Sequence, residues 1–333
     1  MIALLVLAAL HATPTPAVNS EPYTHAQHLV DIGNGRRINI YCLGSGSPTV
    51  IFDSGLEIGS GTLPWRYVQP AVAQFTRACS YDRAGDGFSD PGPLPRTANA
   101  VVSDLHALLD RAGIAPPYIL VAHSIAGLYE PLFAARYESE VAGMVLVDPS
   151  TPGQQELIAS LFPKYQAYEA AQSADMHKCA EAPTLASCVG ATQRTSAAWA
   201  DPVSEIDNFN ESAAELNGAA HGYGAMPLIV LTSTSNLKTI QPLMGATNAQ
   251  VATAQAGWVA LHDQLAAQST RGINCIIPGA GHYIQIDDPR TVIEAIRQVM
   301  TLTPSAKPTC PASASTTRRP VPTPRRSQSS QRR

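Results

Sequence analysis

The sequence predicts an α/β protein built on a mostly parallel, doubly wound sheet. Short, uninterrupted apolar runs alternate along the chain with longer stretches in which apolar residues recur at helical spacing. Bare apolar runs are typical of parallel strands that helices cover on both faces, and their alternation with helices indicates repeated strand–helix units. The chain has 333 residues, of which 45% are hydrophobic and 14% charged, a composition typical of a globular protein with a large core.

The sheet is expected to begin with a hairpin. The apolar runs His28–Ile32 and Ile38–Cys42 flank Gly33-Asn34-Gly35, and Asn-Gly accommodates the positive φ angles of tight hairpin turns. Six further apolar runs are candidate strands: Thr49–Phe52, Ala78–Tyr81, Tyr118–Val121, Met144–Val147, Leu228–Leu231 and Ile273–Ile277.

Helices are predicted between these strands. Thr97 is placed to cap a helix whose apolar residues fall on one side and which Gly113 ends. Asp288 followed by Pro289 predicts the start of another helix near the end of the domain.

One long segment interrupts the alternation. The roughly eighty residues between Val147 and Leu228 contain no good strand candidate, and structureless loops of that length are rare in compact domains. We therefore expect residues 150–224 to form a lid insertion with helical stretches at 154–171 and 204–216. Five of its apolar side chains either line an acyl pocket or pack against the main domain: Leu157, Leu161, Phe162, Tyr165 and Tyr168.

The N-terminal segment favours export. Met1–Leu10 is entirely apolar, about as long as the core of a signal peptide and too short to span a bilayer as a helix. We expect residues 1–20 to be a signal peptide or N-terminal hydrophobic segment, and the protein to be secreted or extracytoplasmic with no stable membrane span. No Lys or Arg precedes the run, and His11–Pro14 is a poor cleavage site, so a mispredicted start or a simple anchor stays open.

The C-terminal tail differs in composition from the body. Residues 303–333 hold seven of the 22 basic residues and no acid, which leaves 15 basic and 26 acidic residues, a net charge of −11, on residues 1–302. Its Pro, Ser, Thr and Arg content predicts a disordered basic tail that is solvated or attracted to a cell wall. No folded module or interleaved aromatic residues support nucleic-acid binding, so none is expected.

The cysteines do not form a metal-binding pattern. The chain has six cysteines and no C-x-x-C spacing, which disfavours zinc and thioredoxin-type chemistry, and no metal is expected. Export would allow the cysteines to oxidise. Cys179 and Cys188 bracket a short segment, and we expect a local disulfide between them.

The stretch Val121–Leu128, VAHSIAGL, follows one predicted strand and begins a helical segment. A strand–turn–helix elbow of this kind raises a serine above the carboxyl edge of the sheet and needs small residues two positions before and after it. Ala122 and Ala126 meet that need. Ser124 is therefore a candidate nucleophile, but it needs a base, because a serine alkoxide does not form at neutral pH unaided.

Residues at the ends of two other strands are candidate partners of Ser124. His282 lies in the glycine-containing loop after the last predicted strand, from which its ring can reach the serine. Asp148 directly follows Met144–Val147 and is the candidate for the buried carboxylate that orients the imidazole. An aspartate at a strand end can instead cap the next turn, and Asp201 or Asp207 in the insertion would then be the alternative acid.

An acyl-transfer site also needs two backbone N–H donors for the oxyanion. The amide of Ile125, directly after the serine, is one candidate. The loop after Thr49–Phe52 reads Ser54-Gly55-Leu56 and offers the amide of Leu56 as the second, with Gly55 next. A plain turn role for Gly55 is the alternative.

Together, these motifs resemble those of esterases and lipases with the α/β-hydrolase fold, over roughly residues 25–302. The segment Tyr81–Asp90, YDRAGDGFSD, is similar to the family's D-x-R-G-x-G-x-S turn. His282, with Gly281 before it and Asp288-Pro289 after it, is similar to the family's histidine loop and final helix. The resemblance implies eight strands in the order 1-2-4-3-5-6-7-8, a lid after strand six, and acyl transfer without a cofactor.

The sequence departs from the family pattern at three points. Alanines replace the glycines of G-x-S-x-G, Ser54-Gly55 replaces the usual His-Gly, and the candidate acid follows strand six rather than strand seven. The strand order that the resemblance implies also places Cys42 and Cys79 on adjacent strands, and so implies a second disulfide.

The expected function is that of a serine hydrolase acting on a small-molecule ester with an apolar acyl or alcohol part. Ser124 attacks the carbonyl, His282 moves the proton and Asp148 orients His282. A serine nucleophile disfavours the epoxide hydrolases and haloalkane dehalogenases of this fold, which need an aspartate there. A cofactor-free perhydrolase or haloperoxidase-type activity with the same three residues is an alternative, as is a non-catalytic relative that binds a small apolar ligand. The ester's chain length and the oligomeric state stay open.

Overall fold

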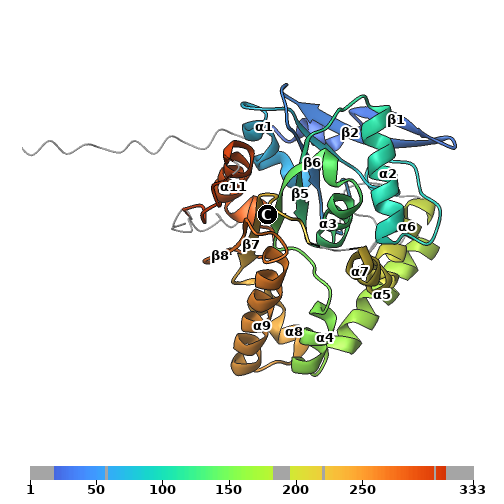
Figure 1. Ribbon diagram of the computed structural model, residues 1–333. Helices are drawn as coiled ribbons and strands as arrows, with labels where there is room; N and C mark the ends of the chain where they lie inside the picture. Colours follow the sequence, from blue (N-terminus) through green and yellow to red (C-terminus); the bar gives the residue numbers. More distant parts are fainter. Residues whose placement is uncertain (1–18, 57–58, 183–195, 220–221, 304, 313–333) are drawn as a thin grey trace, which may run out of the picture.

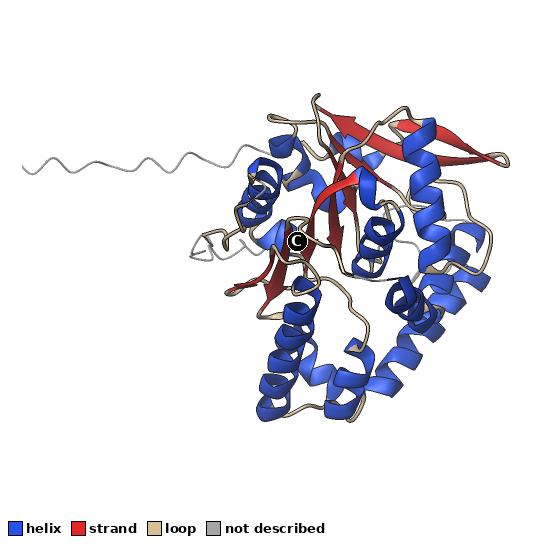
Figure 2. Ribbon diagram, in the orientation of Figure 1, coloured by secondary structure: helices blue, strands red, loops and turns tan. Residues whose placement is uncertain are grey.

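The sheet and its covering helices are those of a doubly wound α/β protein. The computed structural model describes residues 19–56, 59–182, 196–219, 222–303 and 305–312 (Figure 1). The strands within these ranges form an eight-stranded sheet. Helices lie on both of its faces, as Figure 2 shows. The eight strands are β1 His28–Gly33, β2 Arg36–Leu43, β3 Thr49–Asp53, β4 Ala78–Tyr81, β5 Tyr118–His123, β6 Val141–Val147, β7 Leu228–Ser233 and β8 Gly272–Ile277.

The strand order is the one that the resemblance implies, β1-β2-β4-β3-β5-β6-β7-β8. The pairs β1–β2 and β2–β4 are antiparallel and all the other pairs are parallel. Asn34, in the predicted hairpin turn, has a φ of 56°. Every residue of β3, β5 and β7 is buried, because helices cover these strands on both sides, and this is why they read as bare apolar runs.

Helices lie between the strands and in one long insertion. The described helices are α1 Gln69–Val72, α2 Ala98–Arg111, α3 Ala126–Arg136, α4 Gln154–Leu161, α5 Tyr165–Glu181, α6 Ser196–Asp207, α7 Phe209–Ala219, α8 Asn236–Met244, α9 Asn248–Ala266, α10 Ile284–Asp287 and α11 Pro289–Thr301. Three short 3₁₀ helices lie at Glu21–Thr24, Leu63–Tyr67 and Glu138–Glu140.

The two faces of the sheet carry separate cores. Helices α2, α3 and the end of α9 pack on one face, and α1 and α11 pack on the other. The predicted helix ends are confirmed: Thr97 is the N-cap of α2, and the side chain of Asp288 accepts a hydrogen bond from the amide of Thr291 at the start of α11. Gly113 follows α2 with a φ of +66°, a conformation that glycine adopts without a steric penalty.

The insertion between β6 and β7 differs in detail from the prediction. A single helical stretch at 154–171 is wrong, because α4 ends at Leu161 and α5 begins at Tyr165. Phe162 is extended at the break, with φ −110° and ψ 107°. Pro163 follows it, and the residue before a proline is pushed out of the helical region. The second predicted stretch corresponds to the end of α6 and most of α7.

The halves of the insertion pack in different places. Helix α5 contacts α6, α4 packs with α9 at the bottom of Figure 1, and α7 packs on α2 and α3. Most of the predicted apolar stripe joins one cluster with α8 and α9, which contains Leu161, Phe162, Tyr165 and Tyr168 beside Trp258. These four side chains therefore pack against α8 and α9.

Two disulfides lie within the described residues. Cys42–Cys79 joins β2 to β4, as the resemblance implies. Cys275–Cys310 was not predicted, and it ties the chain beyond α11 to β8. The expected Cys179–Cys188 bridge involves Cys188, which lies outside the described residues.

The predicted start of the basic tail at Thr303 needs correction. The Cys275–Cys310 bridge fixes the chain there, and the Arg271 side chain donates hydrogen bonds to the carbonyls of Thr303 and Ala306. Composition did not reveal this, because the contacts come from a distant part of the chain. Residues 313–333 of the predicted tail and 1–18 of the N-terminal segment lie outside the described residues. Among the described helices, none has both the length and the apolarity needed to cross a membrane.

Candidate active site

Ser124 lies in a strained turn between β5 and α3. Its φ is +56°, in the left-handed region, which costs a non-glycine residue about 1–3 kcal/mol. The turn is held from both sides, because the amide of Ser124 donates to the carbonyl of Val147 (3.3 Å) and its carbonyl accepts from the amides of Gly127 (2.8 Å) and Ser150 (2.7 Å). Ala122 and Ala126 are completely buried. The local structure is therefore that of a nucleophile elbow.

The three predicted residues meet at the carboxyl edge of the sheet. His282 Nε2 lies 2.9 Å from Ser124 Oγ, and His282 Nδ1 lies 2.7 Å from Asp148 Oδ2. They come from the segments that follow β5, β6 and β8. This is the geometry in which an imidazole can accept the proton of a hydroxyl while a carboxylate holds the opposite ring nitrogen.

Asp148 is buried and surrounded by donors. Its carboxylate accepts hydrogen bonds from the Ser233 amide (3.0 Å), the Ser233 hydroxyl (2.9 Å) and the Trp258 indole N–H (3.2 Å), besides that of His282. Burial raises the pKa of Asp148, but the hydrogen bond and charge of His282, the nearby His262 and the hydrogen bond from the Ser233 amide together outweigh burial, so the pKa lies below its usual value. Asp148 therefore stays ionised.

Ser233 and Trp258 were missed by the sequence analysis. The segment after the β7 run contains no acid, and it supplies hydrogen-bond donors to Asp148 instead. The position of Ser233 at the carboxyl end of a central strand was an available signal. Trp258 lies in α9 and carried no signal, since its contact with Asp148 joins residues 110 positions apart.

His123, directly before the serine, holds the histidine loop. Its Nε2 lies 3.0 Å from the backbone carbonyl oxygen of His282, so Nε2 carries the proton and donates. Burial, together with the nearby charge of His282, lowers the pKa of His123 well below its usual value and keeps the ring neutral. Its ring centroid lies 4.6 Å from that of His282 and 4.7 Å from that of Tyr283.

The alternative acids of the insertion do not contact His282. Asp201 accepts a hydrogen bond from the amide of Gly92 and pairs with Arg96 at 3.3 Å. Asp207 lies 2.9 Å from the ring of His177.

The loop after β3 lies directly against the elbow. A Cβ on Gly55 would lie 2.9 Å from the Ser124 Cβ and 3.0 Å from His123 Nδ1. Only glycine fits there. Gly55 therefore allows the backbone of this loop to approach Ser124 closely, which is more than a plain turn role. Among hydrogen bonds between described residues, none uses the amide of Ile125 or of Leu56. Both N–H groups are therefore available, among the described residues, to donate to a bound group.

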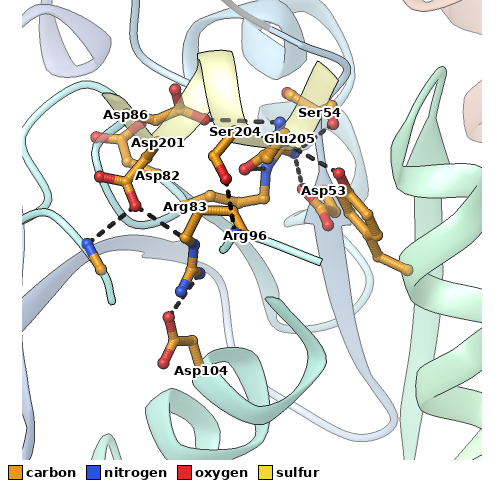
Figure 3. Close-up of polar contacts among 12 residues, drawn as sticks. Asp53, Ser54, Asp82, Arg83, Asp86, Arg96, Asp104, Asp201, Ser204 and Glu205 are labelled. Carbon is orange, nitrogen blue, oxygen red and sulfur yellow. Dashed lines mark hydrogen bonds and ion pairs between the residues drawn. The ribbon is translucent and has the colours of Figure 1, made fainter. Parts of the chain in front are cut away.

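A buried ion cluster lies behind this loop (Figure 3). The Arg83 side chain donates to Asp53 Oδ1 (2.7 Å), to Glu205 Oε1 (3.1 Å) and to the backbone carbonyls of Ser54 (2.6 Å) and Gly55 (2.8 Å). In the sequence, Arg83 stands out only as part of the turn Tyr81–Asp90 that resembles the family's. Its partner Glu205 comes from the insertion, 122 positions away.

Comparison with known proteins agrees with the fold and motifs. The sequence profile of the alpha/beta hydrolase family matches residues 50–295. The chain belongs to this family. It is 26% identical over 256 residues to the uncharacterised protein YqjL of Bacillus subtilis, covering 77% of this chain and 85% of the relative.

Solved structures show the same fold. A probable hydrolytic enzyme from Pseudomonas aeruginosa superposes with a TM-score of 0.59 at 19% identity, covering 83% of this chain and 94% of that one. The enol-lactonase from Burkholderia xenovorans superposes with a TM-score of 0.53 at 18% identity, covering 82% of this chain and all of that one (100%). Within the described ranges, no group of three or more His, Cys, Asp or Glu side chains is arranged to hold a metal ion.

Proposed function

We propose that this α/β hydrolase is a serine hydrolase that cleaves carboxylic esters through an acyl-enzyme intermediate. The observation that carries the proposal is the continuous contact from Ser124 Oγ to His282 Nε2 (2.9 Å) and from His282 Nδ1 to Asp148 Oδ2 (2.7 Å). A fold relative that only binds a ligand has no need of a base aligned on a strained serine.

The proposed reaction proceeds in two halves. His282 takes the proton of Ser124 as the hydroxyl attacks the ester carbonyl, and it then gives this proton to the departing alcohol. Water, deprotonated by His282, attacks the acyl-enzyme and releases the acid. Asp148 keeps the imidazole oriented and stabilises its charged form, which its own ionised state supports.

The oxyanion that forms in each half needs donors beside the elbow. The amides of Ile125 and Leu56 are the proposed donors, with that of Gly55 next, and the close approach of the Gly55 backbone to Ser124 supports this. Losing one such donor typically costs about 2.7–4 kcal/mol of transition-state stabilisation. The substrate that we propose is a small-molecule ester with an apolar acyl or alcohol part, and the insertion between β6 and β7 is the proposed lid.

A fluorophosphonate probe tests the proposal, because an activated serine attacks its phosphorus, releases fluoride and becomes covalently phosphonylated. We expect covalent labelling of the wild type and of Ser103→Ala, an exposed serine of α2, but none of Ser124→Ala. Hydrolysis of p-nitrophenyl esters by Ser124→Ala should fall about 10⁴-fold or more, and a panel from acetyl to palmitoyl esters identifies the preferred chain length. Absence of labelling in folded wild type would contradict the proposal.

The same proposal includes export of the enzyme. The disulfides Cys42–Cys79 and Cys275–Cys310 are typical of an oxidising compartment, and the apolar segment Met1–Leu10 supports a signal peptide. Fractionation of the native host, with mass spectrometry of the mature N-terminus, checks this. Protein found in the cytoplasm with its thiols reduced contradicts it.

A further inference from the structure

We propose that Arg83 is a positioning residue for the oxyanion hole, and that Glu205 of the insertion holds Arg83 in that position. This inference rests on the proposed esterase function and deepens it. It assigns to the insertion a direct mechanical connection to the catalytic centre.

The guanidinium of Arg83 fixes two successive peptide groups of the loop after β3. Nη1 donates to the carbonyl of Ser54 at 2.6 Å and Nη2 to the carbonyl of Gly55 at 2.8 Å. In a planar trans peptide the N–H points opposite to the C=O. Holding these two carbonyls therefore turns the N–H groups of Gly55 and Leu56 away from Arg83, and these are the proposed donors on this loop.

The same peptide groups lie against the nucleophile, because a Cβ on Gly55 would lie 2.9 Å from the Cβ of Ser124. A rotation of either peptide plane would thus change where an N–H points relative to the reacting carbonyl. An oxyanion hole works because its donors are oriented before the reaction, and Arg83 supplies that orientation without touching the substrate.

Arg83 is itself fixed by carboxylates on every side. Its side chain is only 2% exposed, and it pairs with Asp53 at 2.7 Å, Glu205 at 3.1 Å and Asp86 at 3.6 Å. The planar fork of arginine allows it to bind carboxylates and two carbonyls at once, which a lysine cannot do. Figure 3 shows Asp53, Asp86 and Glu205 around Arg83.

Glu205 is the member of this cluster that the insertion contributes. It lies in α6 and accepts from Arg83 Nε through Oε1 and from the Tyr129 hydroxyl through Oε2 (3.2 Å). A shift of α6 moves the carboxylate that holds Nε, and the guanidinium transmits this shift to the Ser54 and Gly55 carbonyls. The insertion is thereby coupled to the oxyanion hole.

The same helix carries a matched control. Asp201 lies four residues before Glu205, and both side chains are 1% exposed. Asp201 also pairs with an arginine of the main domain, Arg96, at 3.3 Å. The described partners of Arg96 are Asp201, Asp104 and Ser204, so it has no contact with the loop after β3.

The experiment compares Glu205→Gln with Asp201→Asn. Each variant is measured for kcat, KM and thermal midpoint, and for inhibition by a trifluoromethyl ketone analogue, which Ser124 converts into a hemiketal oxyanion. For Glu205→Gln we expect kcat and inhibitor affinity to fall about tenfold while KM changes less than about threefold, because only the oxyanion contact weakens. Asp201→Asn should lower the thermal midpoint similarly but keep all three kinetic quantities within about threefold.

Arg83→Lys provides a second variant, since it keeps the charge but loses the two-carbonyl contact. We expect its kcat and inhibitor affinity to fall about 100-fold, close to the loss of one oxyanion donor. Equal kinetic effects of Glu205→Gln and Asp201→Asn, or near-normal inhibition of Arg83→Lys, would show that the cluster only stabilises the fold. A wild type that the fluorophosphonate does not label refutes the esterase proposal itself, so the two failures are distinguished.

Discussion

Two buried aspartates lie on either side of the strand that leads to the nucleophile, and they behave oppositely. Asp53 ends β3 and Asp148 follows β6, the two neighbours of β5 in the sheet. Both are completely buried. Nevertheless, the pKa of Asp148 lies below its usual value and that of Asp53 lies above it.

The difference comes from what each carboxylate faces. Burial raises the pKa in both places. At Asp148 the hydrogen bond and charge of His282, with smaller contributions from His262 and the Ser233 amide, together outweigh burial. At Asp53 burial, aided by the negative charge of Glu205, outweighs the attraction of Arg83 and the hydrogen bond of Tyr81. The single guanidinium there is shared with Asp86 as well. Asp148 thus stays ionised and can stabilise the protonated imidazole of His282. In the Arg83 cluster the charges pair with one another, and the cluster fixes the position of the loop after β3.

The largest expected effect is the loss of kcat when the carboxylate of Asp148 is replaced. Asp148→Asn should lower kcat about 10³- to 10⁴-fold without unfolding the protein, because the amide offers His282 no charge and favours the wrong tautomer. Steady-state ester hydrolysis and circular dichroism measure this. Asp207→Asn, in the insertion and distant from His282, is the control and should keep its activity. Near-normal turnover of Asp148→Asn would show that Asp148 is not the carboxylate that supports His282 in catalysis.

A smaller effect on kcat is expected when one of the hydrogen bonds that hold Asp148 is removed. Ser233→Ala removes the hydroxyl that donates to Oδ2 at 2.9 Å but keeps the backbone amide that donates to Oδ1 at 3.0 Å. We expect kcat to fall about tenfold, the low end of what the loss of one hydrogen bond to a charged group costs (about 1.5 kcal/mol), because three other donors still hold the carboxylate. Trp258→Phe should have the same or a smaller effect, because its donor lies further away, at 3.2 Å. An unchanged kcat in both variants would mean that His282 and the backbone amide of Ser233 suffice to hold the carboxylate.

The smallest expected effect is on the pH dependence of the free energy of unfolding, through the buried Asp201 of α6. Burial raises the pKa of Asp201 to about 6, so between pH 4 and 6 the folded protein binds more protons at this site than the unfolded chain. The contribution of Asp201 to the free energy of unfolding therefore falls as the pH rises through this window, by at most about 3 kcal/mol. Asp201→Asn cannot ionise, so its stability relative to the wild type should increase from pH 4 to pH 7 in urea titrations. Parallel curves for Asp201→Asn and wild type would rule out the raised pKa.

Much of the fold could be predicted because its signals are local. The turn Gly33-Asn34-Gly35 and the pair Asp288-Pro289 act through the conformational preferences of a few neighbouring residues. The break between α4 and α5 is equally local, since Pro163 restricts Phe162, and the apolar periodicity concealed it. The ordered segment around Cys310 could not be predicted, because a disulfide to Cys275 depends on the fold of the whole domain.

The order of apolar runs and helices along the chain places Ser124, Asp148 and His282 at the carboxyl ends of parallel strands, and this alone predicts that the three residues meet. Strand order and direction suffice for that, because all parallel strands end at the same edge of the sheet. The groups around them come from long-range contacts in the folded chain: Ser233 and Trp258 bind Asp148, His123 binds the backbone of His282, and Glu205 binds Arg83. These contacts depend on helix packing and side-chain direction, which no spacing along the chain encodes.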